Sequence, residues 1–257
     1  MSHPDTDKID EEPGSNDDEL GKTVAALTAD DLEPAGRRRL LTRLVGDVRR
    51  RGLGQLFRPK AALRWMGDVV GDIAPHVPVR DRETLRRHFP GLDDDEIAER
   101  LIRNAARGTA GIGAAGGGVA SVEWVAAPTL LSAPVLLAAE TIGVVAIEIK
   151  MIGELHEAYG RPITGAPRHR AVALVQSWTG RRGVNPLVPG VGVATVLGTA
   201  SRKELQGMLL RRFGRNLTTF GPMLTGAAVA GYLNRRATRS LGDDIRQDLK
   251  KRRALDA

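Results

Sequence analysis

One stretch, residues 109–149, constrains the fold of this chain more than any other part of the sequence. It is the longest apolar run and the richest in glycine and alanine, yet three acidic residues interrupt it: Glu123, Glu140 and Glu148. A membrane-spanning helix needs about 20 consecutive, mostly apolar residues, so this run is too often charged for an ordinary span. It is also too hydrophobic for a solvated surface. We therefore expect helices that pack closely against one another, because small side chains let neighbouring backbones approach.

The rest of the chain also shows helical patterns. No stretch in which apolar and polar residues alternate is longer than four residues, so strands are not expected. The sequence therefore predicts an all-α protein, a Gly/Ala-rich helical bundle with apolar helical hairpins at 109–147 and 183–233. These hairpins are expected to pack together and to face or enter a lipid bilayer.

Local signals place several helix ends. Asp93 and Glu96 have the spacing of a capping box, so a helix is expected from residue 94 to about residue 108. Pro128 and Pro134 predict a break in the apolar run that follows. A long helix is then expected from Pro134 to residue 159, with Gly160 as its C-terminal stop.

Charge is distributed unevenly along the chain. Residues 1–36 carry eleven acidic side chains against two lysines, a net charge of −9, whereas residues 37–257 carry a net charge of +16. The first segment has too little apolar surface to offset the entropy of ordering, so we expect a disordered acidic tail. It also lacks the apolar core of a secretory signal, so no signal peptide and a cytoplasmic location are expected.

Residues 37–75 are expected to form a basic amphipathic arm, followed by a single helical domain over residues 80–257. Such an arm can lie on an anionic bilayer with its basic side chains at the lipid head groups. It can equally pack its leucines on the main domain and leave the basic side chains in water, and the sequence leaves both interpretations open. The candidate lipid-facing bases are seven arginines: Arg37, Arg38, Arg39, Arg43, Arg49, Arg50 and Arg51.

The glycine-rich segment contains a GxGxxG pattern from Gly111 to Gly116. In a dinucleotide-binding fold this pattern must follow a buried strand and open a helix, whereas here it follows a capped helix. We interpret the glycines instead as helix-packing positions, with Gly111, Gly113 and Gly117 allowing a neighbouring helix to approach closely.

The three acids of the apolar run, Glu123, Glu140 and Glu148, are candidate buried or intramembrane groups. Glu140 and Glu148 are eight residues apart, about two helical turns, and so lie on nearly the same face. An acid in apolar surroundings has a raised pKa or needs a partner. A proton or metal role therefore competes with a salt bridge to an arginine of another helix, and the salt bridge is the favoured interpretation.

The sequence contains no catalytic constellation. The histidines lack the spacing of a zinc site, no nucleophile elbow occurs, and thiolate metal sites are excluded because the chain has no cysteine. We therefore predict no catalytic, cofactor or metal site, and no small-molecule substrate can be identified from the sequence.

Three features together resemble the EcsC family of bacterial proteins and the related helical domain attached to some bacterial GTPases. They are the Gly/Ala-rich run 108–121, the segment 147–160 with its final Tyr-Gly, and the stretch 226–231 followed by Asn234, Thr238 and Gly242. The resemblance covers residues 95–245. It implies a helical, membrane-associated protein linked to transport or envelope processes, with no established activity. We interpret Asn234 and Thr238, which match the family pattern, as polar groups that clamp one helix to another.

The basic body of the chain calls for an anionic partner. The favoured prediction is a non-enzymatic protein, accessory to transport or envelope processes, that lies on or shallowly in the cytoplasmic side of the membrane. It would bind anionic lipid through its Arg-rich helices, and a membrane transporter or a second copy of the chain is a further candidate partner. A basic soluble nucleic-acid-binding protein is the alternative, disfavoured because few aromatic residues lie near the bases. A membrane-bound hydrolase is the third candidate.

Overall fold

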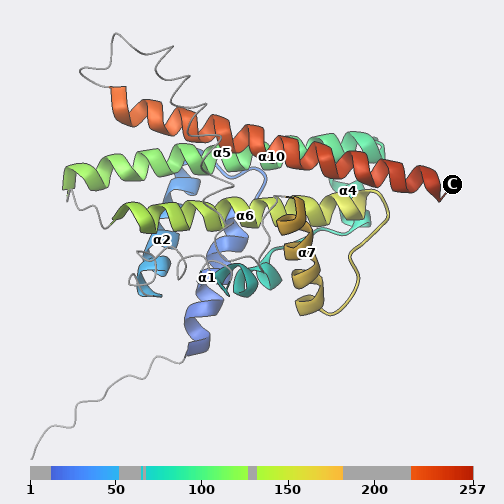
Figure 1. Cartoon of the computed structure of the whole chain (residues 1–257), viewed down its shortest axis with the longest axis horizontal. Helices are drawn as coiled ribbons and strands as arrows, with labels where there is room; N and C mark the ends of the chain where they lie inside the picture. The colour runs from blue at the N-terminus through green and yellow to red at the C-terminus, as the bar shows by residue number, and fades with distance from the viewer. Residues whose placement is uncertain (1–12, 52–64, 66–67, 127–131, 182–220, 257) are drawn as a thin grey trace, which may run out of the picture.

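The computed structural model describes residues 13–51, 65, 68–126, 132–181 and 221–256 (Figure 1). All regular elements in these ranges are helical, which confirms the all-α prediction. They are α1 (Pro13–Leu27), α2 (Pro34–Arg50), the short 3-10 helix η2 (Ala74–His76), α4 (Arg82–His88), α5 (Asp94–Ala126), α6 (Ser132–Ala158), α7 (Pro167–Arg181) and α10 (Gly221–Leu255).

Three long helices, α5, α6 and α10, lie side by side and form the centre of the fold (Figure 1). Helix α5 packs against both others and runs antiparallel to each. Helices α1 and α2 cross this layer at a steep angle, and α2 packs on both α5 and α6. Helix α7 packs on α6 nearer the other end, so α6 is covered from several sides.

The predicted helix ends agree with the structure except at one place. The Glu96 amide donates to Asp93 Oδ1 at 2.8 Å and the Asp93 amide donates to Glu96 Oε2 at 2.9 Å, which is the predicted capping box. Gly160, with φ of +68°, follows the end of α6 as expected. However, α5 continues to Ala126 instead of ending near residue 108. Packing against two neighbouring helices outweighs the low helix propensity of its glycines.

Helices α5 and α6 are separate elements, and the residues between them lie outside the described part of the chain. Helix α5 ends at Ala126 and α6 begins at Ser132. Pro134 therefore lies in the first turn of α6, where no intrahelical hydrogen bond requires its missing N–H. Pro128 lies outside the described residues, as do residues 182–220 of the second predicted hairpin, whereas residues 221–233 belong to α10.

The prediction of a disordered tail over residues 1–36 is wrong for residues 13–36. These residues form α1, the connection that follows it and the start of α2, whereas residues 1–12 lie outside the described part of the chain. Leu20, Val24 and Leu27 are buried in the common core. Their i, i+4, i+7 spacing places them on one face, and its burial offsets the ordering entropy that the acidic composition suggested would prevail.

Helix α2 settles the open interpretation of the basic arm in favour of packing. Leu41, Leu44, Val45 and Val48 are buried and belong to the same hydrophobic cluster as residues of α1, α5, α6 and α10. These four side chains are therefore unavailable to a bilayer in this structure. The predicted separation of an arm at 37–75 from a domain at 80–257 is also not seen, because one core spans both.

Candidate functional site

Glu148 of α6 is buried more deeply than Glu140, the other acid of the apolar run whose side chain the structure describes. Its side chain is fully buried, and two hydrogen-bond donors from other helices reach it. Thr238 Oγ1 of α10 donates to Glu148 Oε1 at 2.7 Å, and Trp178 Nε1 of α7 donates to Glu148 Oε2 at 2.8 Å. The carboxylate thus joins α6 to α7 and α10 through charge-assisted hydrogen bonds.

The hydrogen bonds around Glu148 continue to α5, and we call the whole set the Glu148 clamp. The hydroxyl oxygens of Thr109 and Thr238 are 2.9 Å apart. Because the single hydroxyl proton of Thr238 goes to Glu148, Thr238 accepts a hydrogen bond from Thr109. One turn before Thr238, Asn234 Nδ2 donates to the carbonyl oxygen of Thr109 at 3.3 Å. Asn234 and Thr238 therefore each bond a neighbouring helix, and four helices meet at this polar chain.

Glu140 lies in a different environment although it is only eight residues before Glu148. Its carboxyl group rests on Gly116 of α5, where a β-carbon would overlap it. Among the described residues it has no hydrogen-bond or ion-pair partner. Burial raises its pKa to about 7. The third candidate acid, Glu123, belongs to α5, but its side chain lies outside the described residues.

The glycines predicted to pack helices do so at two described positions. A β-carbon at Gly113 would lie 2.7 Å from the carbonyl carbon of Ala230 in α10, and one at Gly111 would lie 2.7 Å from Cδ of Arg37. Gly117 belongs to α5, and its surroundings are not described. Close approach at Gly113 is between backbones, as the small-residue spacing predicts.

The prediction that Arg37 faces lipid is wrong. Its side chain is buried across α5, and its Nη1 and Nη2 atoms donate to the carbonyl oxygens of Leu27 and Leu32, each at 3.4 Å. Burial lowers the pKa of its guanidinium. Arg37 therefore packs the connection between α1 and α2 onto the helical layer and does not face solvent or lipid.

The other arginines of the predicted set remain at the surface. Five are exposed and Arg51 is half-buried. Some form ion pairs within the chain: Arg50 with Asp47, Arg43 with Glu19 at 3.7 Å, and Arg51 with Asp72 at 3.1 Å. The exposed arginines are Arg38, Arg39, Arg43, Arg49 and Arg50.

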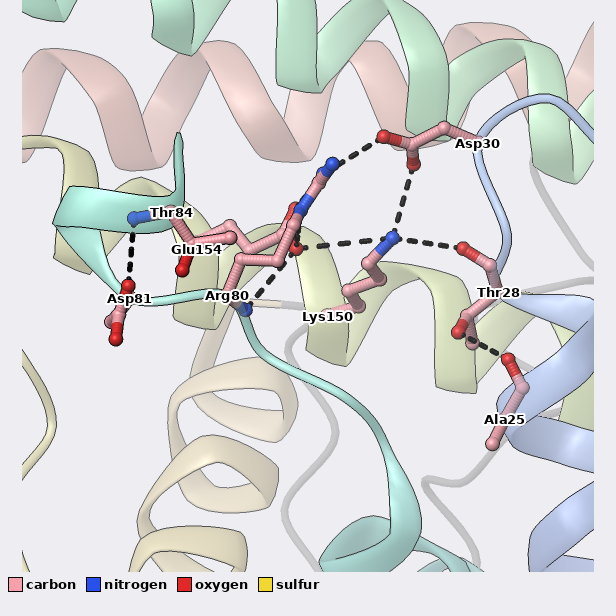
Figure 2. A network of polar contacts seen from close by, with 8 residues as sticks. All are labelled: Ala25, Thr28, Asp30, Arg80, Asp81, Thr84, Lys150 and Glu154. Carbon is pink, nitrogen blue, oxygen red and sulfur yellow. Dashed lines mark hydrogen bonds and ion pairs between the residues drawn. The ribbon is translucent and has the colours of Figure 1, made fainter. Parts of the chain in front are cut away.

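A buried charge network was not predicted from the sequence. Figure 2 shows Lys150 and Glu154 of α6 meeting Asp30 and Arg80 from two connecting segments. Arg80 Nε and Nη2 donate to Glu154 Oε1 and Oε2 at 2.7 and 2.9 Å, and Nη2 also donates to Asp30 Oδ2 at 2.8 Å. Lys150 Nζ donates to Asp30 Oδ1 at 3.1 Å and to the Thr28 carbonyl oxygen at 2.9 Å.

This network holds two connecting segments on α6. It contains two positive and two negative groups, so its charge is balanced. Burial acts to raise the pKa of Asp30, but Lys150 and Arg80 outweigh it and leave that pKa lowered. Beside Lys150 and Glu154 lies a cavity of about 10 Å³, room for about one water molecule. The i,i+4 spacing of Lys150 and Glu154 in an apolar helix was the available sequence signal.

Several bases of α10 pair with acids at the start of α5. Asp94 meets Arg253 at 2.9 Å, and Glu99 meets Arg239 at 2.9 Å and Arg246 at 3.0 Å. These pairs fix the antiparallel register of the two helices. They also occupy much of the basic charge of the last helix, so this part of α10 is less suited to holding lipid than its composition suggests.

The opposite end of the three-helix layer is almost uncharged. We call it the apolar end and define it as the helical residues 109–126 of α5, 132–147 of α6 and 221–233 of α10. Its charged residues are Glu123 and Glu140. The three helix ends lie together at the left of Figure 1, away from α4. Leu137 and Tyr232 within it are each 53% exposed.

Several exposed arginines are sequence neighbours of the residues at which the apolar end begins, near residues 108–111 of α5. We call Arg38, Arg39, Arg107, Arg235 and Arg236 the arginine collar. Their neighbours in sequence meet at one level: Arg37 lies on Gly111, Gly108 contacts Ile147, and Asn234 bonds Thr109. The collar arginines therefore belong to α2, α5 and α10 and lie at about the same position along the axis of the three-helix layer.

Within the described residues, no group of three or more potential metal ligands occurs. Likewise, none of the described helical segments combines the length and hydropathy that crossing a membrane requires. Comparison with models of protein families, with curated proteins and with solved structures finds no match.

Proposed function

We propose that this protein is a non-enzymatic, peripheral membrane protein that binds an anionic lipid surface with its apolar end and arginine collar. The observation that carries the proposal is the sharp boundary near residues 108–111. On one side of it, exposed arginines belong to three different helices. On the other side, the described helices contain two charged residues, both of them acids.

Such a boundary matches the chemistry of a membrane interface. Apolar side chains gain free energy when they leave water for the acyl region, and a surface-bound element buries them about 5–10 Å deep. Arginines at that depth reach lipid phosphates, each contributing about 1 kcal/mol near an anionic surface. Leu137 and Tyr232 supply exposed apolar surface at the proposed contact. The buried leucines of α2 take no part, which revises the insertion expected from the sequence.

The resemblance to the EcsC family supports the same proposal from the sequence. It also supports a role accessory to transport or envelope processes on the cytoplasmic side of the membrane. In that role the bound lipid surface would bring the protein close to a membrane transporter or to a second copy of the chain.

Vesicle co-sedimentation tests the proposal. The full-length chain should bind vesicles of phosphatidylcholine with phosphatidylglycerol and bind phosphatidylcholine alone more weakly. Leu137→Ser and Tyr232→Ser should each weaken binding by about tenfold, because a half-exposed side chain no longer enters the acyl region. The matched control is Val172→Ser on α7, 55% exposed and outside the apolar end, which should bind as the unaltered chain does.

The collar is tested in the same assay. Replacing Arg38 and Arg39 with serine should weaken binding to the anionic vesicles, with little effect on phosphatidylcholine alone. Equal binding of all variants would contradict the proposed surface. Absence of vesicle binding, together with salt-sensitive binding of duplex DNA, would instead favour the nucleic-acid alternative.

A further inference from the structure

Glu140 lies inside the surface proposed to meet lipid, and its position there is unusual. Its side chain is half-buried between α6 and α5, where Gly116 leaves room for the carboxyl group. A residue with a β-carbon at position 116 would displace it. The described part of the chain gives this carboxyl no hydrogen-bond donor and no cation.

The charged side chains that the structure describes on the neighbouring helices are all remote along their own helices. On α5 the nearest described one is Arg107, nine residues before Gly116, and on α6 it is Glu148, two turns after Glu140. On α10 it is Arg235, four residues beyond Gly231, which packs on α5 near Ala110. Arg37 of α2 lies over Gly111 and Gly108, more than one turn from Gly116. None of these forms an ion pair with Glu140 within the described residues.

An ionised carboxylate at this place has no counter-charge among the described residues, and contact with lipid would remove water from the part of the side chain that is still exposed. We infer that the apolar end enters the lipid surface with Glu140 protonated, so that Glu140 makes membrane binding stronger on acidification. This inference rests on the proposed function and adds its regulation.

Two physical effects act in the same direction. In the free protein, burial already brings the pKa of Glu140 to about 7. Lipid contact lowers the local dielectric constant and disfavours the charged form further. Above that pKa, each pH unit costs the protonated form up to about tenfold in population, and binding should weaken accordingly.

The experiment measures binding to vesicles of phosphatidylcholine with phosphatidylglycerol at about pH 6 and about pH 8. The unaltered chain should bind about tenfold more weakly at the higher pH. Glu140→Gln, which mimics the protonated acid, should bind at the higher pH nearly as well as the unaltered chain does at the lower one. The control is Glu157→Gln at the other end of α6, which should keep the full pH dependence.

The outcomes separate this inference from the proposed function. Histidines gain charge on acidification in all three proteins, so only the difference between Glu140→Gln and the others counts. If Glu140→Gln keeps the same pH dependence as the unaltered chain, Glu140 is not the switch, although lipid binding stands. If no protein binds vesicles at either pH, the proposed function fails and the inference with it. A carboxyl titration of Glu140 by NMR near the ordinary glutamate value would also overturn the inference, whatever the vesicles show.

Discussion

Gly113 of α5 and Gly231 of α10 lie in one helix contact that leaves neither position room for a side chain. A β-carbon at Gly113 would lie 2.8 Å from the amide nitrogen of Gly231, and one at Gly231 would lie 2.9 Å from the carbonyl oxygen of Ala110. Both obstacles are backbone atoms, which cannot rotate away as a side chain can. The contact therefore sets the distance between the two helices.

Gly113→Ala should destabilise the protein by about 1–3 kcal/mol, since the added methyl group forces α5 and α10 apart. The control is Gly46→Ala in α2, where the nearest atom to an added β-carbon is the end of the Arg50 side chain, 3.9 Å away. That change should stabilise by up to about 1 kcal/mol through helix propensity alone. Urea unfolding measures both, and equal effects of the two changes would contradict the close contact.

The Glu148 clamp predicts a cost for removing one hydroxyl. Thr238→Val keeps the shape but removes the donor to Glu148 and the acceptor for Thr109, so unfolding free energy should fall by about 1–3 kcal/mol. Thr42→Val is the matched control, because the exposed Thr42 hydroxyl donates to the Arg38 carbonyl oxygen within its own helix. It should change stability by less than about 0.5 kcal/mol. Thermal or urea unfolding of the pair decides whether the buried hydrogen bonds matter.

The Lys150–Glu154 network predicts a larger cost. Glu154→Gln leaves Arg80 and Lys150 partly buried with Asp30 as their remaining acid in the network, and breaking such a pair costs about 3–5 kcal/mol. Glu99→Gln removes the more exposed pairs with α10 and should cost less than about 1 kcal/mol. Hydrogen exchange provides a second measurement, since amides of α1 should lose protection in Glu154→Gln. Unchanged protection would show that the network does not hold this segment.

Glu140 predicts how stability depends on pH in the absence of lipid. Because folding raises its pKa from 4.5 to about 7, the folded state favours the protonated form. Its contribution is therefore complete below about pH 4.5 and is lost as the pH rises to about 7, a loss of about 3 kcal/mol. Glu140→Gln should lack this loss and be more stable than the unaltered chain at about pH 8. Urea unfolding over this range tests it, with Glu157→Gln expected to follow the unaltered chain.

Local sequence signals were sufficient for the fold class and for several helix ends. The capping box of Asp93 and Glu96 and the stop at Gly160 depend on residues within one turn, and both were predicted from the sequence. The packing role of Gly113 was also predicted, because small-residue spacing is a local pattern. Its partner in α10 was not, since spacing alone does not identify the opposing helix.

The predictions that failed concern residues whose burial or order depends on contacts with distant parts of the chain. Arg37 is buried because Gly111, on another helix, leaves space for its stem. Helix α1 is ordered because α2 and α6 cover its apolar face. The acidic composition of this segment had instead predicted disorder. In the charge network, Asp30 and Glu154 are separated by more than a hundred residues, so no local pattern joins them.

The clamp between α5 and α10 also bears on the order in which the molecule forms. Thr109 and Thr238 are 129 positions apart, so ribosomal synthesis completes α5 well before its partner helix exists. During that interval, α2 and α6 are the described helices that can already pack on α5. Contacts between such distant segments slow folding, because a long loop must close before they form. The side of α5 that α10 will cover therefore stays exposed on the nascent chain until late in translation, when chaperones or a nearby bilayer can still compete for it.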